Sequence, residues 1–556
     1  MANQLVAQGC IADTFTSLSI FGADILSIDA NIVNNYSFDV PAAWRYTQPA
    51  VIVDNATFCN VTVTYTHPGQ DDIINAEVWL PPEDSWNGRL QANGGGGWVA
   101  GRFILAYVGM AGAIFDGYAT ASTDAGVTTD SFNTPTWTLT SPGNLHLVNL
   151  DNFGQRSLGD LAVISKKVIE SYYGRPAEYS YWNGCSNGGR QASILAQQYP
   201  DAYDGIIAAA PASYWAELAM NSVWPVFFMD STKQYPRNCE LNQITSLAVA
   251  KCDDLDGIRD GLIANPEACR ANFNAWDYVG TTFRCVDTGS NMKISTAAAS
   301  VAEASWDGPK FSNGDFLWYG HEIGANLSAI AGTTCSNNGT CVPTARSTPT
   351  FWYLQFVRKD PTADLTILSP AQFDELYLTL KRIFSASVEA SEARIAKFYD
   401  LGGKMITYHG LADPTITPQS TLHYYEEVSR LFPNVTDFYR YYRVPGLEHC
   451  FGGNGGQPVH LFDQLRQWVE NGTSPDASPV VIQLPTNGTM DQVPTETATT
   501  TTITTITTTI TTRTMSSSNE GQAPGSSAGR RDADERLLLI AHHERYSHTM
   551  SDIRTP

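Results

Sequence analysis

The stretch 184–188, Gly-Cys-Ser-Asn-Gly, constrains this chain more than any other. A serine between two glycines at this spacing is typical of a sharp turn from a strand into a helix, because a side chain at either glycine would collide as the backbone doubles back. Such a turn presents the Ser186 hydroxyl as a nucleophile. The pattern also arises by chance in glycine-rich chains, so its meaning depends on its surroundings.

The segments around this stretch alternate between helical and extended patterns. Apolar spacing predicts a helix within 151–173, and Gly174 follows it where a left-handed cap is needed. A strand is expected at 179–182, a helix at 189–198 and a buried strand at 205–211. This succession is a crossover unit of a parallel sheet, so the turn has the setting of an α/β-hydrolase nucleophile.

The predicted hydrolase domain occupies two stretches of the chain, 1–211, which opens with antiparallel strands, and 397–486. Between them, 212–396 lose the alternation and hold six of the ten cysteines, and we interpret them as an inserted domain. Residues 487–556 form a threonine- and serine-rich tail with too few apolar residues for a core. We expect the tail to be disordered or O-glycosylated, or to be translated non-coding sequence, although its isoleucines also favour β-structure.

A nucleophilic serine needs a histidine that accepts its proton and a carboxylate that orients the histidine. In α/β-hydrolases the three follow strands in the order serine, acid, histidine. Ser186, Asp413 and His449 occur in this order after strand-like stretches, so we predict them as nucleophile, acid and base. His409 is less suitable because it precedes Asp413 within the same strand end.

Charge and hydropathy exclude several classes of partner. The chain has 34 Lys and Arg against 56 Asp and Glu, and its net charge of −22 repels nucleic acid and anionic membrane surfaces. No apolar run reaches the roughly eighteen residues of a membrane-spanning helix. We therefore expect neither nucleic acid nor a membrane as a partner, and the oligomeric state stays open.

Cysteines and glycosylation signals indicate secretion. The ten cysteines lack the paired spacing of a zinc site, which favours disulfides. Eight Asn-X-Ser/Thr sequons, which also arise by chance in threonine-rich chains, lie at Asn35, Asn55, Asn60, Asn326, Asn338, Asn434, Asn471 and Asn487. Together these features suggest an oxidising compartment. Residues 1–9 lack the segments of a signal peptide, and we interpret the start as truncated or mispredicted.

Two cysteines adjoin the predicted catalytic residues. Cys185 precedes Ser186, and Cys450 follows His449. A disulfide between them would tie the two catalytic loops together, where proton transfer is sensitive to small displacements. Pairing does not follow from sequence alone, so two unrelated cysteines are the alternative.

The stretch 184–189, Asp413 and the pair His449-Cys450 resemble the CS-D-HC arrangement of the tannase and feruloyl esterase family, and the similarity extends over about 10–484. The resemblance implies an α/β-hydrolase domain, a lid inserted between nucleophile and acid, and hydrolysis of phenolic-acid esters. It assigns the nucleophile, acid and base to Ser186, Asp413 and His449.

The resemblance also places the oxyanion donors on the backbone N–H groups of Asn187 and of the glycine run 94–97, with Gly94 and Gly95 as the predicted donors. The residues themselves leave a flexible turn and a substrate-contacting loop equally open. The run of four glycines is longer than the family loop, so it does not fix which glycine donates.

A second site is expected in the lid, where carboxylates recur at short intervals between glycines. Spacing alone leaves a solvated acidic turn and a calcium loop equally open. The resemblance implies Ca²⁺ held by the side chains of Asp253, Asp256 and Asp260 and the carbonyls of Ile258 and Leu262. We expect this calcium to be structural, because its ligands are remote in sequence from the triad.

Cys252 and Cys269 flank the acidic loop and would brace it as a disulfide. For the remaining cysteines the predicted pairs are Cys10–Cys59, Cys239–Cys285 and Cys335–Cys341.

The sequence thus predicts a secreted serine esterase that cleaves phenolic-acid esters, including esters linked to plant polysaccharide or tannin, through an acyl-enzyme. The alternatives are a non-catalytic, glycosylated, wall-associated binding protein on a hydrolase fold and a peptidase with the same triad. The sequence does not assign the acyl group, which could be galloyl, feruloyl, coumaroyl or smaller.

Overall fold

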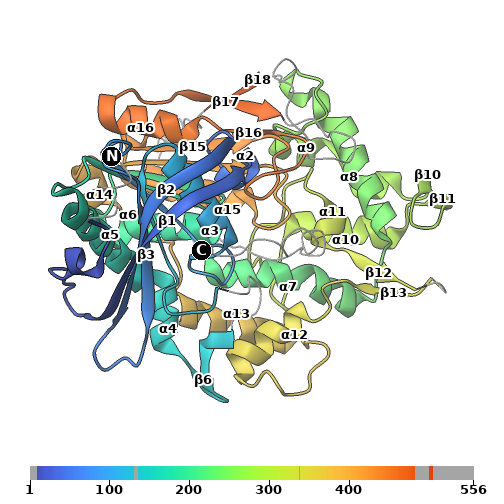
Figure 1. Ribbon diagram of the computed structural model, residues 1–556. Helices are drawn as coiled ribbons and strands as arrows, with labels where there is room; N and C mark the ends of the chain where they lie inside the picture. Colours follow the sequence, from blue (N-terminus) through green and yellow to red (C-terminus); the bar gives the residue numbers. More distant parts are fainter. Residues whose placement is uncertain (1–8, 130–135, 337–338, 483–499, 505–556) are drawn as a thin grey trace, which may run out of the picture.

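A nine-stranded sheet organises the computed structural model, which describes residues 9–129, 136–336, 339–482 and 500–504 (Figure 1). The strands, in spatial order, are β1 (Asp24–Val40), β2 (Val51–Thr66), β3 (Ile74–Leu80), β5 (Ala119–Thr123), β4 (Arg89–Asn93), β8 (Tyr179–Cys185), β9 (Gly205–Ala209), β14 (Lys404–Gly410) and β15 (Tyr439–Val444). The predicted α/β class is confirmed. Residues 1–8 and the sequons Asn338 and Asn487 lie outside the described residues.

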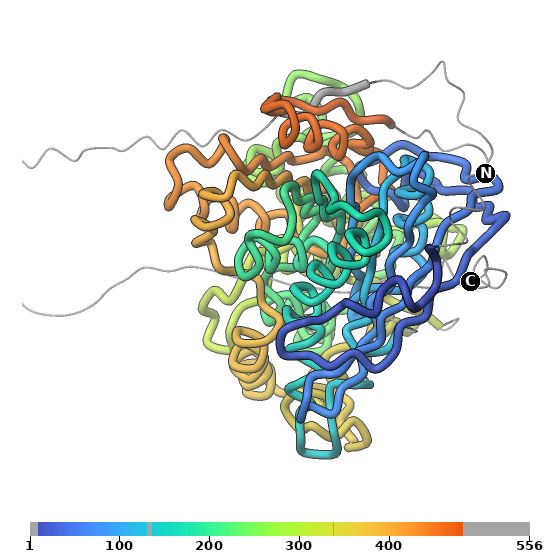
Figure 2. Tube along the Cα trace, turned by 60° about the vertical axis from the view of Figure 1, so that its left-hand side comes forward, coloured from blue at the N-terminus to red at the C-terminus, as the bar shows by residue number. Residues whose placement is uncertain are grey.

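The sheet has two parts with different strand directions. β1, β2 and β3 are antiparallel, and β3 also pairs antiparallel with β5. From β5 to β15 every neighbouring pair is parallel. Figure 2 shows the N-terminal strands in blue and the segments after residue 400 in orange at opposite sides of the molecule. The carboxyl ends of the parallel strands meet at one edge, where α/β enzymes place their sites.

Helices cover both faces of the sheet because the central strands are apolar on both sides. Helices α5 (Ser157–Tyr173), α6 (Asn187–Gln198) and α15 (Pro418–Leu431) share one apolar core with Trp182 and Ile206. On the other face α16 (Leu461–Asn471) packs with Tyr181 and Ile207, and α3 (Ile104–Phe115) packs with Trp79. Adjacent residues of one strand thus point to opposite cores, as strand geometry requires.

The predicted lid, 212–396, leaves the sheet after β9 and returns before β14. It contains α7 (Trp215–Thr232), α8 (Asn238–Cys252), α9 (Pro266–Asn272), β10 (Thr282–Cys285), β11 (Ser290–Lys293), α10 (Thr296–Asp307), α11 (Leu327–Ile330), β12 (Thr333–Cys335), β13 (Cys341–Pro343), α12 (Thr348–Trp352) and α13 (Pro370–Phe384). The helices α8, α10 and α11 enclose their own apolar core, on the right in Figure 1. Residues of α7, α12 and α13 instead join the core of the hydrolase domain, so the insert does not pack as one unit.

The shorter elements lie around the sheet. They are α2 (Ala42–Arg45), β6 (Leu139–Ser141), β7 (Asn144–Leu145), α4 (Leu147–Asp151), the π-helical segments Asn152–Arg156 and Tyr353–Arg358, α14 (Ala396–Asp400), β16 (Gly456–Gln457), β17 (Ala477–Ile482) and β18 (Thr500–Thr504), with short 3₁₀ turns at Ala12–Phe15, Thr136–Thr138, Asp253–Asp256, Ala275–Tyr278 and Val435–Asp437. Among the described helices, none has the length and apolar character needed to cross a membrane.

Of the tail 487–556, the structure describes only β18, which pairs antiparallel with β17. These five residues agree with the β-prone alternative for the tail. The rest of the tail lies outside the described residues.

All five predicted disulfides are present, and all ten cysteines are paired. Cys10–Cys59 joins the N-terminal segment to β2, and three pairs lie within the insert. Cys185–Cys450 spans 265 residues of sequence and joins the end of β8 to the loop after β15.

Candidate active site

Ser186 occupies the sharp turn between β8 and α6. Its backbone has φ 62° and ψ −119°, a strained conformation for a residue with a side chain. The turn is closely packed, since a Cβ added at Gly184 would lie 2.5 Å from the Gly188 carbonyl oxygen, and one at Gly189 would lie 2.4 Å from that of Ala209. The Ser186 N–H donates to the Ala209 carbonyl at 3.0 Å, which fixes the turn against β9.

The other two predicted residues are hydrogen-bonded to each other. Asp413 follows β14 and is fully buried, whereas His449 follows β15 and is about one-fifth exposed. His449 Nδ1 lies 2.7 Å from Asp413 Oδ2. This contact holds the ring so that Nε2 is the nitrogen left for a reacting hydroxyl.

The Asp413 carboxylate is kept ionised by its surroundings. Burial by itself would raise its pKa, but the charge of His449 and hydrogen bonds from His409 and His449 outweigh burial and hold the pKa well below its usual range. Its other oxygen, Oδ1, accepts the N–H groups of Thr415 at 2.7 Å and Ile416 at 2.9 Å.

His409 has a role that the sequence analysis did not assign. It is fully buried, and its Nε2 lies 3.0 Å from Asp413 Oδ2, while Nδ1 lies 2.8 Å from Thr421 Oγ1. Asp413 Oδ2 thus contacts two imidazole rings. The position of His409 four residues before the acid was the available signal, but it does not reveal that both side chains turn inward.

The Cys185–Cys450 disulfide brings the loops of Ser186 and His449 together, with the two Cα atoms 5.9 Å apart. Within the described chain, Ser186 and His449 side chains make no hydrogen bond with each other. Contacts between nucleophile and base are often long in enzymes without substrate and tighten when it binds.

The glycine run lies directly against the turn that carries Ser186, since the Gly188 N–H donates to the Gly95 carbonyl at 2.9 Å. The prediction that Gly94 and Gly95 donate to the oxyanion requires correction. Gly94 N–H donates to the Asn183 carbonyl at 3.1 Å, and Gly95 N–H donates to Gln191 Oε1 at 2.9 Å. Both groups therefore point at protein acceptors rather than at a substrate.

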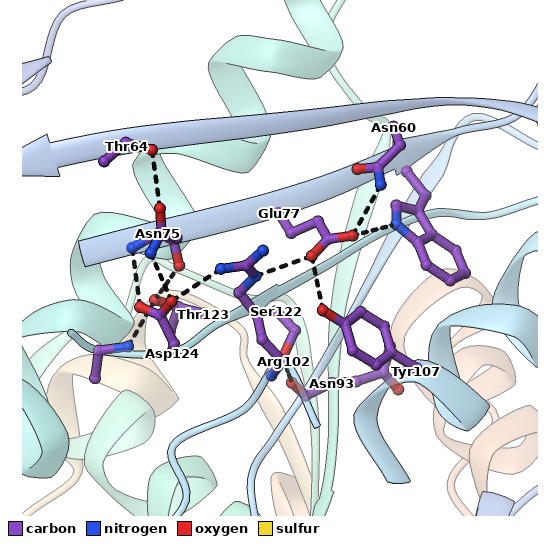
Figure 3. Close-up of polar contacts among 12 residues, drawn as sticks. Asn60, Thr64, Asn75, Glu77, Asn93, Arg102, Tyr107, Ser122, Thr123 and Asp124 are labelled. Carbon is purple, nitrogen blue, oxygen red and sulfur yellow. Dashed lines mark hydrogen bonds and ion pairs between the residues drawn. The ribbon is translucent and has the colours of Figure 1, made fainter. Parts of the chain in front are cut away.

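The loop that follows the glycine run is anchored at its far end by Arg102 (Figure 3). Its guanidinium binds the buried carboxylates of Glu77 and Asp124, each at 2.9 Å. Glu77 Oε2 also accepts the Tyr107 hydroxyl at 2.9 Å, and the Arg102 N–H donates to Ser122 Oγ at 3.1 Å. These bonds fix the loop to β3 and β5.

The acidic loop of the lid has oxygen donors typical of a calcium site. Asp253 Oδ1 accepts the Gly261 N–H at 2.8 Å, and the Asp256 and Asp260 carboxylates also accept loop N–H groups. Asp254 instead pairs with Arg259. Among the described residues, no three of these carboxylates approach within 4.8 Å of one another. The donor types therefore fit calcium, but the carboxylates would have to draw together to bind it.

This loop is remote from the triad in sequence but not in space. The Leu262 side chain packs closely on Gly446: a Cβ added to Gly446 would lie 2.5 Å from Leu262 Cδ2. Glu267 pairs with Arg443 at 2.8 Å. Both contacts fall on the segment that leads to His449, so distance in sequence from the triad does not by itself separate this part of the insert from the triad in space.

Comparison with known proteins places this chain in a family. The family described as tannase and feruloyl esterase matches residues 59–510. The chain belongs to this family. It is 37% identical over 467 residues to a probable feruloyl esterase of Arthroderma benhamiae, covering 82% of this chain and 84% of that protein. It is 27% identical to a tannase of Aspergillus oryzae, covering 85% and 89%. The solved tannin acyl hydrolase of Aspergillus niger shares the fold, with a TM-score of 0.79 at 24% identity, covering 90% and 92%. This tannase and feruloyl esterase family member is a carboxylic ester hydrolase.

We predict that replacing both Cys185 and Cys450 by serine weakens catalysis more than substrate binding. The disulfide is the covalent link between the loops of Ser186 and His449. Its loss should cost about 2–5 kcal/mol of stability and lower kcat, with a smaller change in KM. Calorimetry and steady-state kinetics on an aryl ester would measure both effects. The matched control, Cys335→Ser with Cys341→Ser, should leave kcat unchanged, and equal kcat losses in the two variants would contradict the role of the clamp.

We predict that Asp413→Asn lowers kcat by about 10³- to 10⁴-fold, because the histidine loses the carboxylate that sets its tautomer.

The same variant should also change how stability depends on pH. The depressed pKa of Asp413 means that the charged carboxylate stabilises the fold above about pH 4, and that this contribution is lost as the pH falls further. The melting temperature of the variant should be below that of the wild type at pH 7, and the difference should shrink below pH 4. A constant difference would contradict this account.

Proposed function

We propose that this ester hydrolase acts through Ser186 as nucleophile, His449 as base and Asp413 as orienting acid. The observation that carries the proposal is the 2.7 Å contact between His449 and the buried Asp413 carboxylate. The disulfide ties the loop of His449 to the turn of Ser186. Family membership argues against both a non-catalytic binding protein and a peptidase.

In this mechanism His449 Nε2 takes the proton of Ser186 as Oγ attacks the ester carbonyl. The imidazolium that forms is stabilised by Asp413, whose low pKa keeps it ionised. His449 then protonates the departing alcohol, and a water molecule, activated by the same ring, releases the acid from Ser186.

The oxyanion would be bound by the Asn187 N–H, which lies in the first turn of α6 and so has no partner within the helix. A second donor would come from the far end of the glycine run. Gly97 has φ 52°, and among the described residues its N–H donates to no protein acceptor. Gly97 thus replaces Gly94 and Gly95 in the proposal.

The proposed substrates are esters of phenolic acids, such as those linked to plant polysaccharide or tannin. The names of the relatives, feruloyl esterase and tannase, support this class. We also propose that the protein is secreted and glycosylated. Its five disulfides suit an oxidising compartment, and Asn35, Asn55, Asn326, Asn434 and Asn471 are exposed.

We predict that Ser186→Ala abolishes hydrolysis of methyl ferulate, methyl gallate and short-chain aryl esters while the melting temperature stays close to that of the wild type. The methyl side chain removes the nucleophile and leaves the turn intact. Ser193→Ala, in the helix α6 that follows Ser186, is the control and should retain activity. Full activity of Ser186→Ala would refute the mechanism, and hydrolysis by the wild type of only the short-chain esters would refute the substrate class.

We further propose that Asp253, Asp256 and Asp260, with the carbonyls of Ile258 and Leu262, bind structural Ca²⁺. The oxygen donors and the turns of the loop support the proposal. The ion would order the loop that packs on Gly446.

We predict that a calcium chelator lowers the melting temperature and that added Ca²⁺ restores it, because the ion binds only the folded loop. Asp256→Asn should abolish this response, whereas Asp254→Asn, which removes only the partner of Arg259, should keep it. Differential scanning calorimetry would measure the shift. An identical melting temperature with and without Ca²⁺ would contradict the site.

A further inference from the structure

Arg190, in the first turns of α6, is a buried cation that the mechanism does not use. Its side chain is fully inaccessible, and no described carboxylate pairs with it. Burial lowers its pKa to about 9, which still leaves it charged at neutral pH. A buried charge without an opposite charge is costly and needs hydrogen bonds that replace water.

Those hydrogen bonds connect three parts of the fold. Nη1 donates to the carbonyls of Gly154 at 2.6 Å and Val388 at 2.9 Å, and Nη2 donates to that of Phe153 at 3.1 Å. Phe153 belongs to the π-helical segment before α5, and Val388 lies where the insert returns to the sheet. The fourth bond is from Nε to Asn187 Oδ1 at 2.7 Å.

The bond to Asn187 determines how that side chain is turned. A guanidinium can only donate, so Oδ1 of the amide must face Arg190. The Nδ2 end then faces the other way and donates to the Val99 carbonyl at 3.1 Å. Val99 lies just beyond the glycine run, so the amide joins the nucleophile helix to that loop.

Two further contacts hold the same loop. Gln191 accepts the Gly95 N–H at 2.9 Å and donates to the Ala100 carbonyl at 2.8 Å. Asn187 and Gln191 are both fully buried, so water does not compete for these bonds. Residues of α6 therefore hold the glycine-run loop at Gly95 and again at Val99 and Ala100.

We infer that Arg190 is a positioning residue of the oxyanion hole: it orients the Asn187 amide, which fixes the distance between the Asn187 N–H and the glycine run. The inference rests on the proposed mechanism, in which these two segments supply the oxyanion donors. Donors of this kind act only where they are held in place before charge develops, so a displaced loop weakens binding of the transition state more than binding of the substrate.

Two variants break the link at different atoms. Asn187→Ala keeps the backbone N–H and removes only the amide, and Arg190→Lys keeps the charge and removes the Nε donor. We expect each to lower kcat by about 10- to 100-fold with KM little changed. The affinity for phenylboronic acid, which mimics the tetrahedral intermediate on Ser186, should fall in proportion, while the affinity for ferulic acid should not. The kcat of the double variant should be no lower than that of the less active single variant, because both changes act through one link.

Arg89→Lys is the matched control, because Arg89 forms a bidentate ion pair with Glu470 at the opposite end of β4 from the glycine run. It should lower the melting temperature without changing kcat. The inference is overturned if Asn187→Ala and Arg190→Lys lower stability but keep the wild-type ratio of phenylboronic acid to ferulic acid affinity. If Arg190→Lys does not fold, Asn187→Ala decides alone. An active Ser186→Ala would instead refute the proposed mechanism, so the two failures are distinguishable.

Discussion

The covalent link between Cys185 and Cys450 is the constraint on which the site depends. It joins the end of a central strand to a loop near the edge of the sheet, across 265 residues of sequence. Ser186 and His449 are the neighbours of these cysteines, so their separation is limited by a bond rather than by loop packing alone. The large insert can therefore lie between Ser186 and Asp413 in the sequence without leaving the loops of Ser186 and His449 independent of each other.

Around this link the site is built from buried polar groups that are satisfied by specific partners. Asp413 remains ionised in a dry environment because two histidines and two backbone N–H groups offset the cost of burial. Arg190 remains charged because carbonyl oxygens and the Asn187 amide surround it. Each group ties a different set of segments together, as satisfied buried networks do.

Much of this could be predicted from the sequence because strand, turn and cap signals are local. The Gly174 cap, the strand before Ser186 and the order of the three proposed catalytic residues follow from short patterns. The contacts of Gly94 and Gly95 could not be predicted, because they depend on carbonyl and amide groups about ninety residues away. The packing of Leu262 on Gly446 and the divided core of the insert are likewise tertiary features that leave no periodic signal.

The central claim is that one serine, activated by His449, carries the reaction. It is tested most directly by labelling the wild-type enzyme with a fluorophosphonate and mapping the modified peptide by mass spectrometry. The account predicts a single adduct on Ser186 that forms in step with the loss of esterase activity, and much slower labelling of His449→Ala. An adduct on another residue, or full activity after Ser186 is completely modified, would contradict it.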